Sequence, residues 1–477
     1  MINFLDTIFS KFRSCFTRNI TFGWFVVIVM GLMVRTDNLG VTSIIRSLAL
    51  APIYDPLIGF FRSSAWVLET LEIRWQHVVK AYAPLVKVDN AVVMVGDGVK
   101  TGKEGNFMVG VKKLHQESGD SSKGEYIYGH MFGGIGVIAC KGAKKFCVPL
   151  ALRLQDGVKT ILKWKDPLVR QGSHVEEMIT LACGAASTFG KVILLLDRLF
   201  LTVPALLKLL ECRANGSEVN IVTKAKSNCT AFKEPPAKKP GQRGAPRKIG
   251  KKVKLFGLFD SETEQFTDSV VKLYGKDEPV RWYCVDLLWG KKLYMKLRFV
   301  LAECCGYRTI LVSTDLSMSP LSIIGLYGMR FGIESMFREF NQVICGFGYH
   351  FWTKKWPKLN RWAKKGASDP LDTVTDKKSR ERILLALKAT EGFAFVSIVA
   401  QGLLQLLSLS FSNTEEMANL RYLRTRRQSV VSEATTADFL RKNLFALLLN
   451  NTNSRISQLI LSKQKRKISK IDNQRAS

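Results

Sequence analysis

Apolar residues follow a helical pattern over the first 85 residues of the chain. They are concentrated in 22–34, 41–50 and 57–79, and the segment 36–40 between the first two holds turn and capping residues. Helix, short turn and helix is the outline of a helix-turn-helix, so 1–85 is predicted to be a helical DNA-binding region. Any small helical bundle gives the same outline, and this pattern does not separate the two.

Near residue 90 the pattern changes to short apolar runs, which predict strands, separated by segments with a helical period. Helices are expected at 174–189 and 203–211. The order of strand, hairpin strands, helix, strand and helix is typical of an α/β fold and matches the ribonuclease-H-like arrangement. We assign this catalytic core to 86–224 and 305–350. Its expected strands are 91–95, 107–111, 126–140, 146–154, 192–196 and 219–223.

Residues 225–304 interrupt the predicted core with a basic loop and a group of strands. The loop, 233–254, holds nine Lys and Arg residues against one Glu, together with four prolines. Such a loop can lie extended on phosphate or can be a solvated linker. Its candidate DNA contacts are Lys238, Lys239, Arg243, Arg247 and Lys248. The expected strands of a small β-subdomain are 253–259, 280–287 and 293–301, and 309–313 would return to the main sheet.

Residues 351–477 are predicted to form a helical C-terminal region with a basic tail. Between 351 and 365 three tryptophans alternate with six Lys and Arg residues, which suits a nucleic-acid surface and equally the edge of a packed helix. Farther on, 393–411 runs 19 residues without a charge, long enough to cross a membrane. Its glutamines and serines reduce its hydrophobicity, so we interpret it as a buried core helix and expect no membrane partner.

Composition narrows the choice of partner. The chain has 71 Lys and Arg residues against 40 Asp and Glu, a formal charge of +31. An excess of this size indicates a polyanion, with nucleic acid ahead of an anionic membrane surface. The ten cysteines form no C-x-x-C pair and do not cluster with the five histidines, which argues against a zinc site and a disulfide framework. The start of the chain lacks the pattern of a secretory signal, so the cytoplasm is expected.

Three carboxylates in this framework could form a catalytic site. Asp97 and Asp197 are each predicted to end an apolar strand, and Glu334 lies on a predicted helix. If that helix is continuous, Tyr327, Arg330 and Glu334 share one face. Three carboxylates can hold two divalent metal ions for phosphoryl transfer. Taken singly, Asp97 between two glycines is more commonly a turn residue, Asp197 could be the N-cap of the helix that follows, and Glu334 could pair with Arg330 or Arg338 on its helix.

The order and spacing of these residues resemble those of bacterial insertion-sequence transposases of the DDE class. In one group of that class a β-strand insertion interrupts the acidic core, and the last acid lies in a Y-x2-R-x3-E-x6-K signature. Tyr327, Arg330 and Glu334 match this spacing, and Asn341 stands in the lysine position. Asp97 and Asp197, each after an apolar run, resemble the first two acids.

The resemblance implies a mechanism and a set of partners. Asp97 would bridge two Mg²⁺ ions, which Mn²⁺ can replace, with Asp197 and Glu334 each beside one ion. DNA would be nicked at the ends of the element, pass through a hairpin and be joined to target DNA, which calls for a homodimer on DNA in the bacterial cytoplasm. Outside the basic loop, the residues expected to contact DNA are Tyr327, Arg330, Arg338 and Asn341, and either Trp282 or Trp289 would stack a flipped base.

Three other functions fit parts of the pattern. A structure-specific nuclease would use the same metal core. A catalytically silent DNA-binding derivative is favoured by Asn341, because an amide makes a weaker phosphate contact than an ammonium group, although Arg338 or Lys354 could compensate. The presence of all three acids counts against that reading. A basic membrane-associated protein rests on 393–411 alone.

Overall fold

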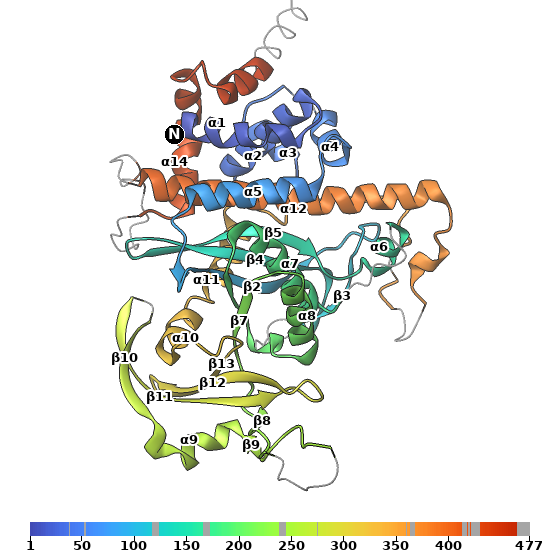
Figure 1. The fold of residues 1–477 in the computed structure, drawn as a ribbon. Helices are drawn as coiled ribbons and strands as arrows, with labels where there is room; N and C mark the ends of the chain where they lie inside the picture. Colours follow the sequence, from blue (N-terminus) through green and yellow to red (C-terminus); the bar gives the residue numbers. More distant parts are fainter. Residues whose placement is uncertain are drawn as a thin grey trace, which may run out of the picture.

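The computed structural model describes residues 1–464 apart from 38, 52–53, 117–123, 166–171, 238–244, 274, 359, 363–367, 413–416, 418–419 and 421–429. Within them the chain forms a large, open, mixed sheet and a layer of helices. The long helix α12 (Lys377–Phe411) lies between the two. In Figure 1 the N-terminal helices and α14 (Glu433–Leu449) lie on one side of α12 and the sheet lies on the other. The fold is therefore α/β, as predicted.

The helical layer is built around α2, an apolar helix that is buried on all sides. Fourteen of its sixteen residues are buried, and it packs against α3, α4, α12 and α14. The second helix of the predicted helix-turn-helix corresponds to α3, which has only six residues. The layer is therefore a packed bundle, and a DNA-binding role for 1–85 stays a prediction. Its helices are α1 (Ile2–Lys11), α2 (Asn19–Val34), α3 (Thr42–Ser47), α4 (Asp55–Arg62) and α5 (Leu68–Tyr82).

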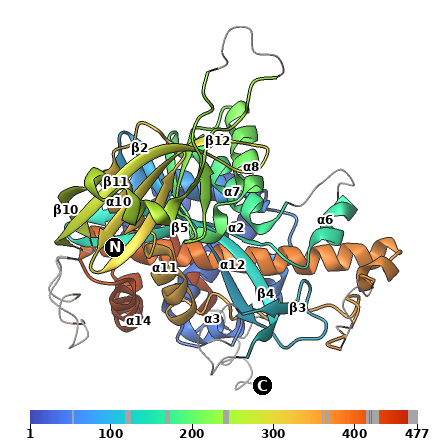
Figure 2. The ribbon, with the colours of Figure 1, turned by 90° about the horizontal axis from the view of Figure 1, so that it is seen from below.

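The predicted apolar stretch forms most of α12 and is buried, as expected. Among the described helices α12 alone is long and apolar enough to cross a membrane, but 78% of its most apolar window is buried inside the protein. It begins after Asp376, whose Oδ1 accepts a hydrogen bond from the Ser379 amide at 2.8 Å. A Cβ on Gly402 would lie 2.2 Å from the Trp75 ring of α5, so the glycine permits the close packing. Figure 2 shows α12 crossing the width of the sheet.

Five strands form the centre of the sheet in the order β5-β4-β2-β6-β7. Neighbours among β5, β4 and β2 are antiparallel, whereas β2, β6 and β7 run parallel. Helix α7 (His174–Phe189) leads into β6, and α8 (Val203–Ala214) connects β6 to β7. The strands are β2 (Ala91–Gly102), β4 (Tyr126–Lys141), β5 (Lys144–Leu154), β6 (Val192–Leu195) and β7 (Val219–Lys224).

One strand expected in this core is absent. The segment 107–111 forms turns, with Gly110 at a φ of 83°, and β3 (Lys112–His115) starts at the next residue. A positive φ of this kind interrupts an extended strand, so the apolar run was misleading there. The remaining short elements beside the core are β1 (Lys87–Val88), which pairs with β2, and α6 (Lys159–Lys165).

The inserted strands continue the same sheet. β13 (Tyr307–Ser313) pairs with β7, as predicted for the return to the main sheet, and β12 (Met295–Cys304) and β11 (Lys276–Trp289) follow outward. The strand expected at 253–259 is wrong beyond 254, because Leu255 and Phe259 are buried at helical spacing. The other elements of the insertion are β8 (Thr230–Phe232), β9 (Lys252–Lys254), α9 (Leu258–Ser261) and β10 (Thr267–Leu273).

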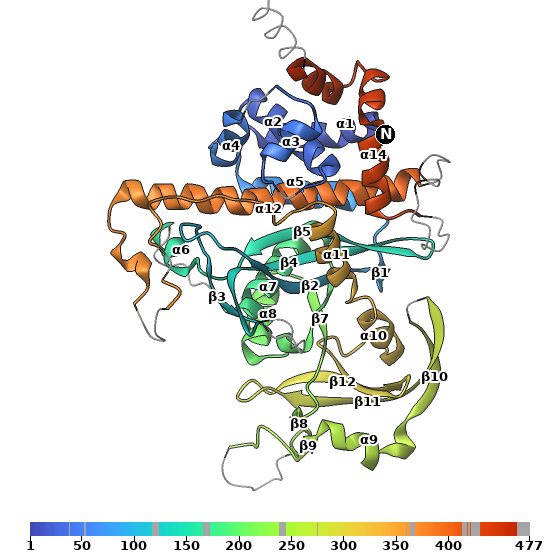
Figure 3. The same ribbon diagram turned by 180° about the vertical axis from the view of Figure 1, so that it is seen from behind.

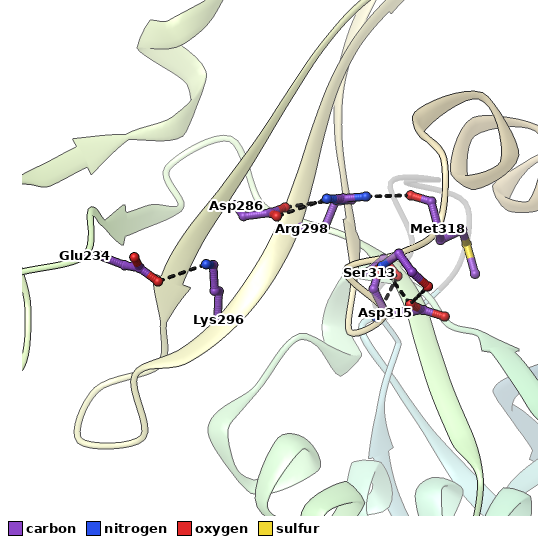
Figure 4. Close-up of polar contacts among 8 residues, drawn as sticks. Glu234, Asp286, Lys296, Arg298, Ser313, Asp315 and Met318 are labelled. Atoms are coloured by element: carbon purple, nitrogen blue, oxygen red, sulfur yellow. Dashed lines mark hydrogen bonds and ion pairs between the residues drawn. The ribbon is translucent and has the colours of Figure 1, made fainter.

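An arginine joins the insertion to the loop that leads into α10 (Pro320–Tyr327). Arg298 on β12 donates from Nε and Nη2 to the two carboxylate oxygens of Asp286 on β11, at 2.9 and 3.0 Å. Its Nη1 donates to the carbonyl oxygen of Met318 at 3.0 Å (Figure 4). A bidentate pair of this kind fixes direction as well as distance, so the insertion helps to position α10.

The single helix expected to carry Tyr327, Arg330 and Glu334 is broken in two. α10 ends at Tyr327, and α11 (Gly332–Gln342) begins after a turn held by hydrogen bonds between residues three apart. α10 packs on β10 and β13 of the insertion side, whereas α11 packs on β2 and β5 of the core (Figure 3). The continuous helix was a wrong prediction because the two halves follow two different packing surfaces.

Candidate active site

Asp97 lies within β2 and not at its end, since the strand continues for five more residues. Glycines around it allow helices to approach both faces of the sheet. A Cβ on Gly96 would lie 2.8 Å from Sδ of Met178 in α7. Gly134 on β4 pairs with Asp97 on β2, and a Cβ there would lie 3.0 Å from the Phe337 ring of α11. The glycines therefore bring α11 close to the strand beside the carboxylate.

The strand register places Asp197 next to Asp97. β2 and β6 are parallel with Val95 opposite Leu195, and each aspartate follows two residues later. Neighbouring strands are roughly 5 Å apart, so the two backbones are close at this level. Asp197 occupies the N-cap of a one-turn helix, but its side chain makes no capping hydrogen bond. The N-cap interpretation is therefore not supported, and the carboxylate is free of that role.

A buried guanidinium connects Asp97 to the third acid. Arg330 comes from the turn between α10 and α11, and its side chain is only 8% exposed. Its Nη1 donates to Oδ2 of Asp97 at 3.3 Å, and its Nη2 donates to Oε1 of Glu334. The predicted residues therefore do meet, although they reach one another through a turn and not along one helix face.

The electrostatics of these groups show that they share one site. Burial raises the pKa of Asp97 to about 6, the Gly98 amide and Arg330 oppose the rise, and the charges of Asp197 and Glu334 add to it. Burial also raises the pKa of Tyr327 to about 12, with Arg330 opposing and both aspartates adding to the rise. An additional cation beside Asp97 would relieve the cost of ionising it.

The donor set fits a hard divalent cation, but its present arrangement is centred on the arginine. Carboxylate oxygens are the ligands that Mg²⁺ prefers. In the part of the chain that the structure describes, no three His, Cys, Asp or Glu side chains are close enough to hold an ion as they stand. Glu334, which is half exposed, faces Arg330. Binding of an ion by all three acids therefore requires the Glu334 side chain to move away from the guanidinium.

The predicted DNA contacts differ in their surroundings. Arg338 and Asn341 are exposed on α11, where Arg338 pairs with Glu339 at 3.1 Å. In the basic loop Arg247 and Lys248 are exposed. The other three loop candidates, Lys238, Lys239 and Arg243, lie outside the described residues.

A pocket of about 520 Å³ opens beside Asp197, and of the two candidate tryptophans only Trp289 lines it. It is lined by Arg198, the residue after Asp197, and by Trp289, whose Nε1 donates to Sγ of Cys229 at 3.2 Å. Trp282 instead donates to Ser269 at 3.1 Å and lies outside this pocket. Sequence reasoning missed the other basic and aromatic lining residues, because they come from several separate segments: Lys226, Phe232, Lys252, Lys291 and Tyr294.

Comparisons with known protein families, curated proteins and solved structures gave no significant match.

Proposed function

We propose that the protein is a DDE-type transposase that cuts and joins DNA at the ends of an insertion sequence with the help of divalent metal ions. The observation that carries the proposal is that Asp97 and Asp197 follow paired residues of adjacent parallel strands, while buried Arg330 joins Asp97 to Glu334 from a distant helix. Convergent carboxylates in a basic protein suit phosphoryl transfer on nucleic acid.

The strand order supports a ribonuclease-H-like core for this enzyme. Three antiparallel strands are followed by two parallel ones, with α7 and α8 in the connections. Asp97 is on the first strand and Asp197 directly follows the fourth, which is the placement expected of the first two acids.

The acids would hold Mg²⁺, or Mn²⁺ in its place, which supplies charge to the leaving oxygen and activates water. Arg330 would then bind a phosphate oxygen pair near the cut, since a guanidinium binds phosphate as well as carboxylate in a bidentate manner. Tyr327 keeps its proton because burial raises its pKa to about 12, so its hydroxyl can donate to the same phosphate. Both residues position DNA relative to Asp97.

The pocket beside Asp197 supports one of two candidates for stacking a flipped base. Trp289 lines a pocket that also contains Arg198 and other cations. Trp282 lies outside this pocket, where it is hydrogen bonded to Ser269. Base stacking on an aromatic ring with nearby positive charge is a common way to hold an extruded nucleotide. Pairing of two element ends on two copies of the chain would make the active form a homodimer on DNA.

Two observations favour a second function, a DNA-binding derivative that no longer cuts. Asn341 replaces the signature lysine, and Arg330 pairs with two of the acids that an ion would need. Such a protein would bind the element ends and block their use. A structure-specific nuclease would share the acids and differ only in its substrate.

Cleavage of a labelled duplex that carries the repeats flanking this gene tests the proposal. The unchanged protein with Mg²⁺ is expected to nick the duplex at the repeat edge. Asp97→Asn and Glu334→Gln are expected to abolish nicking. Glu339→Gln provides a matched control, because Glu339 lies on the same helix as Glu334 but pairs with Arg338; it should keep activity.

Two other results would each replace the transposase with a different function. Binding of the repeat without any cleavage would replace the transposase with the silent derivative, and Asn341→Lys would then be tested for recovery. Cleavage of branched DNA with no preference for the repeat would replace it with the nuclease.

A further inference from the structure

A second hollow, of about 830 Å³, opens at the far end of the strand that carries Asp97. Its walls come from the segment after β2, from β4 and from the chain that follows α11. Its lining includes three aromatic residues and two cationic residues: Phe107, Tyr128, Trp352, Lys103 and Arg361. We call this hollow the aromatic groove.

Two of the three aromatic residues of the groove are exposed, and a backbone hydrogen bond joins their segments. Trp352 is 55% exposed and Phe107 is 38% exposed, although burying such rings is normally favourable. The Thr353 amide donates to the carbonyl oxygen of Phe107 at 3.1 Å, so the backbone connects the two segments that present the rings. Two exposed aromatic rings on linked segments are a suitable platform for a flat ligand.

The cationic side of the groove is also preorganised. The Arg361 guanidinium lies 5.0 Å from the centre of the Tyr128 ring, and its Nη2 donates to the carbonyl oxygen of Glu104 at 2.7 Å. The Tyr128 hydroxyl donates in turn to the carbonyl oxygen of Arg361. Glu104 adds one acid to the lining, and the exposed Lys354 beside Trp352 adds a further positive charge. The groove therefore combines stacking faces with the exposed Arg361 guanidinium, whereas the Lys103 ammonium group is buried and donates to backbone carbonyls.

The acids and the groove both contact the segment 330–349. Asp97 pairs with Arg330, and Lys103, just beyond the end of β2, donates to the carbonyl oxygens of Phe347 and Tyr349. Residues an even number apart on a strand point to the same side. The five residues from Asp97 to the end of β2 span about 17 Å at 3.3 to 3.4 Å per residue.

We infer that the aromatic groove binds unpaired bases of a single DNA strand that continues from the phosphate at the acids. The inference rests on the proposed function, since it assigns the groove to the same DNA. Aromatic faces stack on bases of any sequence, and nearby cations attract the backbone. The groove suits unpaired bases because the base faces of a closed duplex are already stacked on each other.

The test uses full-length protein in EDTA, so that binding is measured without cleavage. Trp352→Ala and Phe107→Ala are expected to weaken binding of a fluorescent oligothymidylate about tenfold and to leave binding of a blunt duplex within about twofold. Tyr307→Ala provides a matched control, because it removes a more exposed ring from β13, outside the groove; it should change neither affinity. Thermal unfolding of each variant checks that it is folded.

A second measurement does not depend on any variant. Photo-crosslinking of unchanged protein to an oligonucleotide with 5-bromodeoxyuridine is expected to label peptides that contain Phe107, Tyr128 or Trp352. Labelling confined to other peptides, or equal loss of single-strand and duplex binding in the groove variants, would overturn the inference. Absence of Mg²⁺-dependent cleavage would overturn the proposed function and would leave these binding results intact, so the two failures are distinguishable.

Discussion

At the scale of residues the site is organised by a guanidinium placed among carboxylates. Arg330 is buried and pairs with both Asp97 and Glu334. Burial raises the pKa of Asp97, and the guanidinium opposes that rise only in part. Near neutral pH Asp97 is therefore ionised at a cost to stability, and this cost has measurable consequences.

Asp97→Asn is expected to raise the free energy of unfolding at pH 7.5 but not at pH 4. The folded pKa of about 6 lies above the ordinary value of 3.8, so between these values the folded state binds more protons than the unfolded state. Stability therefore falls as pH rises through this window, by about 3 kcal/mol in total, and asparagine removes the loss. Urea unfolding without Mg²⁺ at both pH values measures the change. An equal effect at the two pH values would contradict this origin.

Mg²⁺ is expected to raise the Tm of the unchanged protein and to leave that of Asp97→Asn nearly constant. A ligand that binds only the folded state at 100 times its Kd stabilises it by about 2.7 kcal/mol. Thermal unfolding with and without saturating Mg²⁺ measures the shift. Glu339→Gln should respond like the unchanged protein, and a full shift in Asp97→Asn would place the ion away from these acids.

At the scale of elements, local patterns predicted much of the fold, and features set by tertiary packing escaped prediction. α7 occupies the predicted residues because its period is clear and Ser173 and Glu176 form a capping box at its start. The break between α10 and α11 could not be predicted, since only packing on two different surfaces interrupts a locally helical sequence. The pocket around Trp289 escaped prediction for a similar reason, because its lining comes from separate segments.

The packing of α12 against α5 gives a prediction at this scale. Gly402→Ala is expected to lower the free energy of unfolding by about 1 to 3 kcal/mol, because the added methyl group would overlap the Trp75 ring. Gly184→Ala in α7 is the matched control: nothing lies within 4 Å of the added Cβ, so the better helix propensity of alanine should stabilise the protein by up to about 1 kcal/mol. Urea unfolding of both variants measures the two effects. Stabilisation by both substitutions would show that the helices can move apart.

At the scale of the whole molecule two recesses of different origin lie near the strands that lead to Asp97 and Asp197. The pocket beside Asp197 contains Trp289 from the insertion, and the aromatic groove begins where β2 ends. In Figure 1 the insertion lies at the far end of the protein from the helical layer. One recess begins at the residue after Asp197 and the other at the end of the strand that carries Asp97, so each proposed stacking site is connected through the chain to one of the acids.

The charge of +31 gives the prediction that belongs to the whole molecule. Each phosphate neutralised by a Lys or Arg side chain releases counterions, so the logarithm of the binding constant for duplex DNA falls linearly with the logarithm of salt concentration. The double variant Arg247→Ala/Lys248→Ala is expected to reduce that slope by about 2, because both side chains are exposed in the basic loop. Fluorescence anisotropy between 50 and 200 mM salt, roughly the range over which such contacts lose most affinity, measures the slope. Lys191→Ala/Lys442→Ala removes the same charge from exposed positions outside the loop and should leave the slope unchanged. If both double variants lower it equally, the DNA contact is spread over the surface and the loop has no special role.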